Sequence, residues 1–351
     1  MKLLIQFVAF LLIAICNQAF AQTWPEYHLT NGNHYTSYGV EEFDPLYARN
    51  LYIDPSATVF AGSTELDDIY NGNQVYLSGG TVFASAIDEP DFTWNSGTLH
   101  LNGGLHGTTY SLEAGTAKTL NIDSGAVVDR TASLAIASGN ELYVNDGGTL
   151  LVGDFDASMA GFHFNEGGTL EVNGMLSGSG SDLLNGESQH LMLRGPFAGW
   201  NTGQIALGQE TKLSILNGAV METAALGTYY WENGSLEVSG NGSEFRTTGR
   251  LYIGEDGARR NNFTVSNEGK VFSSRVYIGE NGGDHNTATV TGPNSEWNIN
   301  GKLSVGSGIG GEGNRLVIED GGLVNSASGI IGGDERGSEG NGVEVRGSCL
   351  L

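Results

Sequence analysis

The chain is poor in cysteine and in proline. Among its 351 residues there are two cysteines and six prolines. Cys16 lies in an apolar N-terminal run, so Cys349 stands alone once that run is removed, and no intramolecular disulfide could brace the fold. Charged residues make up 16% and hydrophobic residues 39%, which is not the composition of a disordered chain. We therefore expect a large core held by burial and hydrogen bonds.

Basic residues are also scarce. There are 16 of them against 40 acidic residues, and losing Lys2 with an N-terminal leader leaves 15 and a net charge of −25. A surface this acidic repels phosphate backbones and anionic lipid headgroups. We therefore expect no nucleic-acid partner.

The N-terminus has the pattern of a secretory signal peptide. Lys2 precedes an apolar run at 3–16, and the small-residue site Ala19-Phe20-Ala21 follows. The run of about 14 residues is too short to span a bilayer, so we expect no transmembrane segment in the mature chain. The pattern predicts cleavage between Ala21 and Gln22 and a secreted or cell-surface location.

The C-terminal third repeats itself, and this decides the predicted fold. VSGNGSEF (238–245) returns as VTGPNSEW (290–297), and RLYIGE (250–255) returns as KLSVGS (302–307), both at an offset of 52 residues. The repeat divides into units whose first aliphatic residues are 27, 25, 28 and 27 residues apart. These residues are Val238, Val265, Val290, Ile318 and Val345. Internal repeats of this length are typical of solenoids.

Each unit contains three short strand patterns, for example NFTVS, KVFSS and RVYIGE, followed by a polar loop. Three strands and a return loop predict one turn of an all-β, three-sided, right-handed, single-stranded parallel β-helix, with about a dozen coils along the chain. Aliphatic residues that should stack as ladders are Leu251 and Ile253, Val276 and Ile278, and Leu303 and Val305. The glycines that close these strands (Gly254, Gly279, Gly306, Gly332) should adopt positive φ at sharp turns.

The sequence pattern divides the chain into four parts. Residues 1–21 are the predicted signal peptide, and residues 22–70 an aromatic-rich N-terminal cap. Residues 71–235 predict irregular β-helix coils. Residues 236–351 predict regular coils of about 26 residues, the last of them incomplete.

The runs VTGPNSEW, KLSVGS and IEDGGLVNSASGIIGGD resemble the repeats of bacterial autotransporter passengers and PEP-CTERM-associated exported proteins. The resemblance covers about residues 236–347 and implies an exported β-helix of structural or adhesive character, with no catalytic residues to carry over. The chain stops at GVEVRGSCLL, without the barrel or sorting segment of such proteins. We read it as a C-terminally truncated relative, because a stack that ends within a coil leaves a strand edge exposed.

Motifs for chemistry are sparse. GSGIGG (306–311) fits a dinucleotide fingerprint but precedes another strand pattern and no helix, so no cofactor is expected. No nucleophile motif or metal-binding histidine spacing occurs, and the chain is predicted not to be an enzyme. Acidic loops offer calcium candidates at Asp256, Asp284 and Asp334, although aspartate is also an ordinary turn residue.

Aromatic residues recur at one place in the repeats and could stack on sugar rings. The main candidates are Trp94, Trp231, Phe245 and Trp297, and Phe162, Phe164 and Tyr230 share the pattern. The competing interpretation places these rings at coil corners, where they bury apolar area.

These observations predict a non-enzymatic exported repeat protein that acts as a structural or adhesive element, with glycans or other cell-surface components as partners. One alternative is a polysaccharide lyase or hydrolase built on a β-helix, because fold alone does not decide function. The other is a passive spacer without a ligand.

Overall fold

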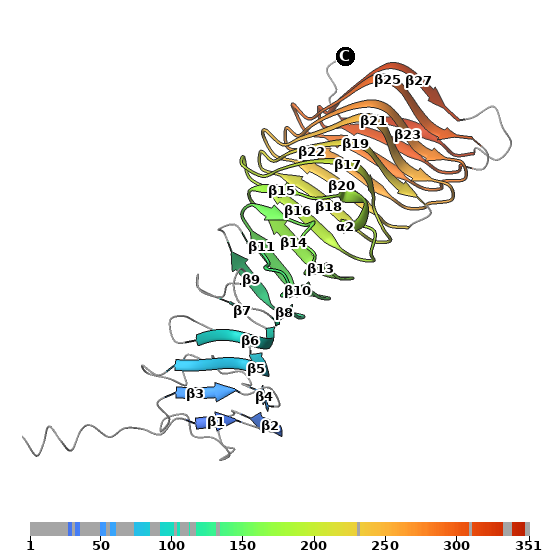
Figure 1. The fold of residues 1–351 in the computed structure, drawn as a ribbon. Coiled ribbons are helices and arrows are strands. Elements are labelled where there is room, and N and C mark those ends of the chain that lie inside the picture. The colour runs from blue at the N-terminus through green and yellow to red at the C-terminus, as the bar shows by residue number, and fades with distance from the viewer. Residues whose placement is uncertain are drawn as a thin grey trace, which may run out of the picture.

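The computed structural model describes residues 27–29, 32–35, 50–53, 57–60, 74–84, 92–101, 104–105, 112, 117–130, 134–229, 232–308, 311–332 and 339–347. These residues form one elongated stack of parallel strands (Figure 1). The predicted signal peptide and its cleavage site, Ala21 and Gln22, lie outside the described residues.

The second of three sheets runs along most of the stack. Its eleven strands pair in parallel, each with the strand one coil away. They are β7 (Gly104–Leu105), β9 (Val127–Arg130), β11 (Thr149–Val152), β14 (Thr169–Val172), β16 (His190–Arg194), β18 (Lys212–Leu216), β20 (Ser235–Ser239), β22 (Asn262–Ser266), β24 (Thr287–Thr291), β26 (Arg315–Glu319) and β28 (Gly342–Arg346). Each of these eleven strands therefore stacks on the equivalent strand of the next coil.

The first sheet occupies the N-terminal part of the stack. Seven strands follow one another: β1 (Tyr27–Leu29), β3 (Asn50–Ile53), β5 (Gln74–Ala84), β6 (Phe92–Leu101), β8 (Lys118–Ile122), β10 (Glu141–Val144) and β13 (Phe162–Phe164). Beside them, β2 (Gly32–Tyr35) pairs with β4 (Ala57–Phe60), which pairs with β5. Strands from the segment predicted as a cap thus join the same ladder as the coils that follow.

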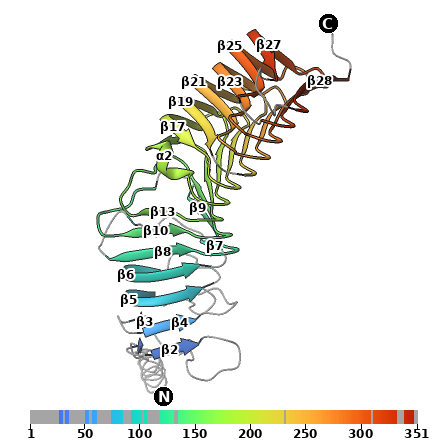
Figure 2. The same cartoon turned by 90° about the vertical axis from the view of Figure 1, so that its right-hand side faces the viewer.

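The third sheet occupies the C-terminal part. Its eight strands are β12 (Phe155–Asp156), β15 (Met175–Ser177), β17 (Gly199–Ala206), β19 (Val220–Tyr229), β21 (Glu244–Glu255), β23 (Lys270–Glu280), β25 (Glu296–Ser307) and β27 (Leu323–Ile331). The first sheet ends at β13, close to where the third begins at β12. The stack changes direction between β6 and β17, and the short helix α2 (Gly180–Leu183) lies just before β17 in the chain (Figures 1 and 2).

Aliphatic ladders fill the interior, as the repeat predicts. Val238 pairs in register with Val265, Val265 with Val290, and Val290 with Ile318. The first three of these side chains are 0% exposed. Removal of stacked aliphatic side chains from water is the main stabilising contribution in such a fold. The predicted fold class, an all-β, three-sided parallel β-helix, is confirmed.

In the regular coils, one long bent strand supplies two of the three sides. The sequence predicts KVFSS and RVYIGE as separate strands, whereas both belong to β23. The pairing register of β23 with its neighbours β21 and β25 shifts in the middle of these strands, next to Ser273. Such irregularities bend a strand, so two of the three sides come from one strand without a loop between them.

The predicted glycine turns are confirmed, and the structure adds a second reason for them. Gly279 has a φ of +70°, which side chains rarely tolerate. A Cβ atom at this position would also lie 2.1 Å from the side chain of Asn314. Gly254, Gly306 and Gly332 have positive φ as well.

Candidate functional site

A cavity lies beside β13, the last strand of the first sheet. Phe162 pairs with Leu142 and Phe164 with Val144, and both partners are fully buried, so the two rings stand in core positions. In the next coil, the described residues contain no strand that continues this sheet, and α2 lies there instead. The two rings are consequently only half-buried. A cavity of about 330 Å³ lies against them.

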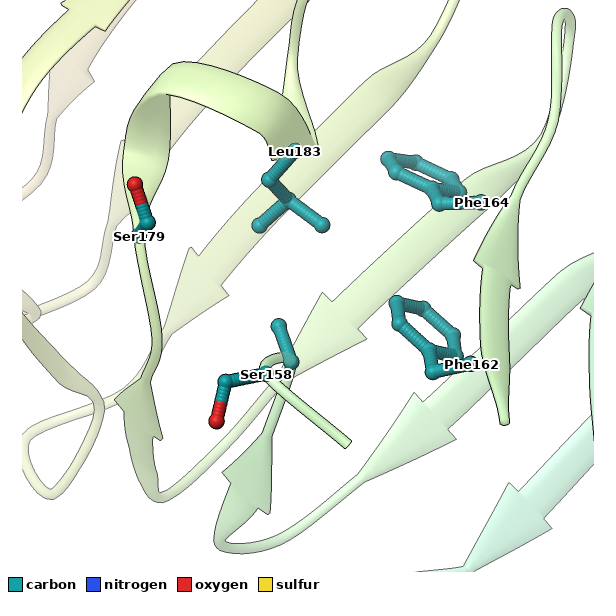
Figure 3. Close-up of a pocket in the computed structure, with 6 residues that line it drawn as sticks. Ser158, Phe162, Phe164, Ser179 and Leu183 are labelled. Atoms are coloured by element: carbon teal, nitrogen blue, oxygen red, sulfur yellow. The ribbon is translucent and has the colours of Figure 1, made fainter. Parts of the chain in front are cut away.

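The two phenylalanine rings are stacked. Their centroids are 6.3 Å apart and their planes differ by 18°, so their faces are nearly parallel. Figure 3 shows the two rings one above the other, in similar orientations. Phe155 packs edge-on against Phe162 at 4.7 Å, and the Gln189 side-chain amide donates a 2.6 Å hydrogen bond to the carbonyl of Phe164. These contacts hold β13 against its neighbours.

The wall across from the rings consists of one leucine and three small residues. Ala157 and Ser158 follow β12, and Ser179 and Leu183 come from the α2 segment (Figure 3). The Ser158 amide and hydroxyl donate to Asp156 Oδ1 at 2.9 and 2.6 Å. Hydrogen bonds from Ser158 also hold the pKa of Asp156 below its usual range.

Strand β17 anchors the α2 segment. The Gly180 amide donates to Thr202 Oγ1 at 2.9 Å, and the Trp200 indole N–H donates to the Gly178 carbonyl at 3.4 Å. The side chain of Trp200 is 2% exposed, so this anchor belongs to the core. These hydrogen bonds hold the α2 segment against β17.

A cluster of aromatic and charged side chains lies on the outer face of the third sheet. The rings of Tyr252 and Tyr277, which pair in register, stack with centroids 5.0 Å apart. Arg250 Nη1 donates a 2.7 Å hydrogen bond to the Tyr252 hydroxyl. A cation and two aromatic faces thus stand together on neighbouring coils.

Carboxylates complete this group at the end of the same strands. Glu255 pairs with Glu280 on the next coil. Burial, followed by the nearby charges of Asp256 and Glu280, raises the pKa of Glu255 to about 7, and burial also raises the pKa of Glu280. Glu255 Oε2 is buried and has no hydrogen-bond partner. A carboxyl whose pKa lies near neutrality is a candidate proton donor or acceptor.

An asparagine ladder runs through the interior of the regular coils. Asn261 Nδ2 donates to Asn286 Oδ1 at 2.9 Å, Asn286 Nδ2 to Asn314 Oδ1 at 3.0 Å, and Asn314 Nδ2 to Asn341 Oδ1 at 3.1 Å. Each receiving Oδ1 also accepts the backbone N–H of the preceding asparagine in the ladder. Asn261, Asn286 and Asn314 are at most 1% exposed. The ladder therefore satisfies buried polar groups that would otherwise destabilise the fold.

Sequence reasoning did not find this ladder, although a signal exists. The four asparagines are 25, 28 and 27 residues apart, each just before a strand of the second sheet. Asn140 has the same geometry earlier in the chain, since its Oδ1 accepts the Lys118 N–H at 3.0 Å and its Nδ2 donates to the Leu112 carbonyl at 2.8 Å. Asparagine is also a common turn residue, which hid the pattern.

The predicted aromatic candidates do not form an exposed ladder in the described part of the chain. Phe245 and Trp297 are both 0% exposed, and the Trp297 indole N–H donates to Ser273 Oγ at 3.0 Å. Neither ring is available to a glycan, so the core interpretation replaces the stacking hypothesis for these two residues. The side chain of Trp94 and all of Trp231 lie outside the described residues.

The calcium candidates occupy turns. Asp256 has a φ of +53°. Asp284 Oδ1 accepts the Glu312 amide at 2.9 Å, and its Oδ2 lies 3.4 Å from Arg259 Nε, so this carboxylate stabilises the loop. Asp334 lies outside the described residues. Across the described ranges, no three His, Cys, Asp or Glu side chains lie close enough together to hold a metal ion. Calcium binding stays a prediction.

None of the helices in the part of the chain that the structure describes is both long and apolar enough to cross a membrane.

No protein-family model matches the chain. None of the curated proteins matches it either. Among solved structures, a TibC-catalysed hyper-glycosylated fragment of TibA is similar, with 14% sequence identity over 93% of this chain and 98% of the fragment. The TM-score of 0.22 is too low for this likeness to support an argument. The fold therefore rests on the strand pairing described above.

Proposed function

We propose that this protein is an exported, non-enzymatic structural or adhesive element that acts at the cell surface or in the extracellular space. The observation that carries the proposal is the unbroken parallel pairing of the second sheet over eleven strands. Neighbouring coils share backbone hydrogen bonds, aliphatic ladders and the asparagine ladder, so the chain forms a rod that holds surfaces apart. The leader pattern at residues 1–21 supports export, and the resemblance to autotransporter passenger repeats supports a surface role.

The test is a localisation and adhesion experiment on the full chain. We expect a C-terminally tagged chain to be found in the medium or to be removed by protease from intact cells, with a mature N-terminus at Gln22. We also expect cells that produce it to attach better to glycan-coated or cell-derived surfaces than cells that lack it. A chain retained in the cytoplasm would refute the proposal. Export without any gain in attachment would remove the adhesive role.

One observation favours a second candidate, a polysaccharide-cleaving enzyme. Glu255, with its pKa raised to about 7, lies near Arg250, which is hydrogen-bonded to Tyr252. Such a set could move a proton beside a bound sugar. Release of unsaturated or reducing ends from pectin, alginate or glycosaminoglycans, abolished by Glu255→Gln, would establish this candidate in place of the first.

A further inference from the structure

We propose that this chain binds a second copy of itself side by side, through three basic side chains on the third sheet of one copy and a row of acidic turns on the other. The three basic residues are Arg250, Arg275 and Lys302, and we call them the basic strip. The inference rests on the proposed function, because it names the contact through which a structural rod would assemble.

The basic strip crosses three neighbouring coils on the outer face of the third sheet, where β21, β23 and β25 lie side by side (Figure 1). Arg250 pairs in register with Arg275. Val276 and Leu303 also pair in register. The residues that precede them, Arg275 and Lys302, are therefore neighbours on adjacent coils. Because coils stack about 4.8 Å apart, three positive charges lie within about 10 Å along the rod.

The basic strip has no acidic partner within the described part of the chain. None of its three side chains forms an ion pair there, and the Arg250 guanidinium donates to the Tyr252 hydroxyl instead. The usual arrangement occurs on the same sheet, where Lys270 pairs in register with Glu296 and its Nζ lies 3.7 Å from Oε2. Like charges directly opposite each other on neighbouring strands are destabilising. A negatively charged partner from outside would remove this cost.

The two glutamates at the end of the same strands do not neutralise the basic strip. Neither Glu255 nor Glu280 forms an ion pair with it. Burial raises the pKa of both carboxyls, to about 7 for Glu255, so Glu255 is only partly ionised near neutral pH. Both residues also lie beyond the tyrosine row, away from the exposed Arg250 and Arg275.

Acidic turns with the same spacing occur on another edge of the rod. The turns before β11, β14, β16 and β18 each expose one acidic side chain, and we call these four residues the acidic ridge: Asp146, Glu166, Glu187 and Glu210. Backbone hydrogen bonds join these turns from coil to coil, for example from the Gly167 amide to the Glu187 carbonyl at 3.0 Å. The ridge therefore carries one carboxylate per coil, at the spacing of the basic strip.

A second copy fits the basic strip better than another anionic partner, because the chain itself supplies carboxylates at this spacing. The chain has 40 acidic against 16 basic residues, so two copies repel each other over most of their surfaces. Electrostatic complementarity therefore selects the one contact in which strip meets ridge. Since strip and ridge are different surfaces, the contact is heterologous and can repeat from copy to copy. We expect open lateral assemblies rather than a closed dimer.

The test measures self-association of the full chain by sedimentation velocity and small-angle X-ray scattering, from about 20 mM to about 500 mM sodium chloride. We expect the mean mass to rise with protein concentration at low salt. Association should weaken about tenfold or more at high salt, because salt screens exposed charges. Arg275→Glu in the basic strip and Glu187→Lys in the acidic ridge should each weaken association by a similar factor. A mixture of the two variants should associate again, since each supplies the surface that the other has lost.

The matched control is Lys270→Glu, which makes the same change of charge on the same strand but outside the basic strip. This variant should associate as the unmodified chain does. Arg275→Gln should weaken association without adding a negative charge, which keeps the test valid if Arg275→Glu does not fold. A chain that stays monomeric at every salt concentration, association that salt does not change, or a mixture that stays monomeric would each overturn the proposal. So would a monomeric chain that binds polygalacturonate through Arg275, because an acidic polysaccharide would then occupy the strip.

The outcomes also separate this proposal from the wider one. A monomeric chain that is exported and promotes attachment would keep the proposed function and remove the lateral assembly from it. Salt-sensitive association of a chain that stays inside the cell would keep the contact and refute the proposed function.

Discussion

Replacing Asn286 by alanine probes the asparagine ladder at its centre. The substitution removes four side-chain hydrogen bonds. Asn286 Oδ1 accepts from the backbone N–H and the Nδ2 of Asn261, and Asn286 Nδ2 donates to Ala258 O and to Asn314 Oδ1. All four bonds lie in the interior, where water cannot replace them.

The expected loss of unfolding free energy depends on which hydrogen bonds each partner of Asn286 keeps. The Ala258 carbonyl keeps the Asp284 amide at 3.1 Å, and Asn314 Oδ1 keeps the backbone N–H of residue 286 at 3.0 Å. The cost therefore concentrates on Asn261, whose backbone and side-chain donors both lose the acceptor that Asn286 supplied. With about 1 to 3 kcal/mol for each buried group that loses a partner, we expect a destabilisation of about 2 to 4 kcal/mol.

Guanidinium unfolding followed by circular dichroism measures this loss as a lower midpoint at unchanged slope. Amide hydrogen exchange at residue 261 should accelerate, which locates the effect in the ladder. The matched control is Asn325→Ala, because Asn325 makes an exposed 2.9 Å bond to Asn298 Oδ1 and should change stability by less than about 0.5 kcal/mol. Equal effects of the two substitutions would refute the structural role of the ladder.

Three further substitutions test other parts of the structure. Gly279→Val should lower the free energy of unfolding by about 3 kcal/mol or more, because it combines a φ of +70° with displacement of the Asn314 side chain. Gly332 has a φ of +73° and open space around it, so Gly332→Val should cost only the backbone strain. Equal shifts of the melting temperature in the two variants would contradict this difference. Trp297→Ala should cost about 3 to 5 kcal/mol in guanidinium unfolding, since the ring is 0% exposed, and a neutral result would mean that the ring is not in the core. The pKa of Glu255 is raised from 4.5 to about 7, so its contribution to stability is present below pH 4.5 and is lost as the pH rises through 7. Glu255→Gln should therefore gain about 1 to 2 kcal/mol over the parent chain between pH 5 and pH 8, after a discount for solvent screening; unfolding curves with the same pH dependence in both proteins would show that the side chain is solvated.

The repeat predicted most of the fold because it sets the register of stacked coils. The spacing of Val238, Val265 and Val290 is the spacing of strands that pair side by side. The alternation at Val276 and Ile278 predicted which side chains face inward, and both are 0% exposed. The bend within β23 was missed, because the shift in pairing register depends on neighbouring coils and leaves no local mark in KVFSSRVYIGE.

The candidate site was harder to predict. Phe162 and Phe164 have the same sequence pattern as the buried Phe245, and their exposure depends on a strand that the next coil does not form. That difference lies in residues 178–189, which follow Phe164 by 14 residues or more. The raised pKa of Glu255 likewise depends first on burial and then on the charges of Asp256 and of Glu280 on the neighbouring coil, and of these the sequence shows only the adjacent Asp256.

Because of the asparagine ladder, this protein can become longer or shorter by whole coils. Each rung bonds only to its neighbours, and the rungs tolerate separations of 25, 27 or 28 residues because the loops between them absorb the difference. Duplication or loss of one coil would therefore reconnect one asparagine to the next and leave the interior unchanged. An insertion of one residue within a strand would instead turn its apolar side chains outward. Evolution can lengthen such a rod in whole-coil steps, and a designer can do the same.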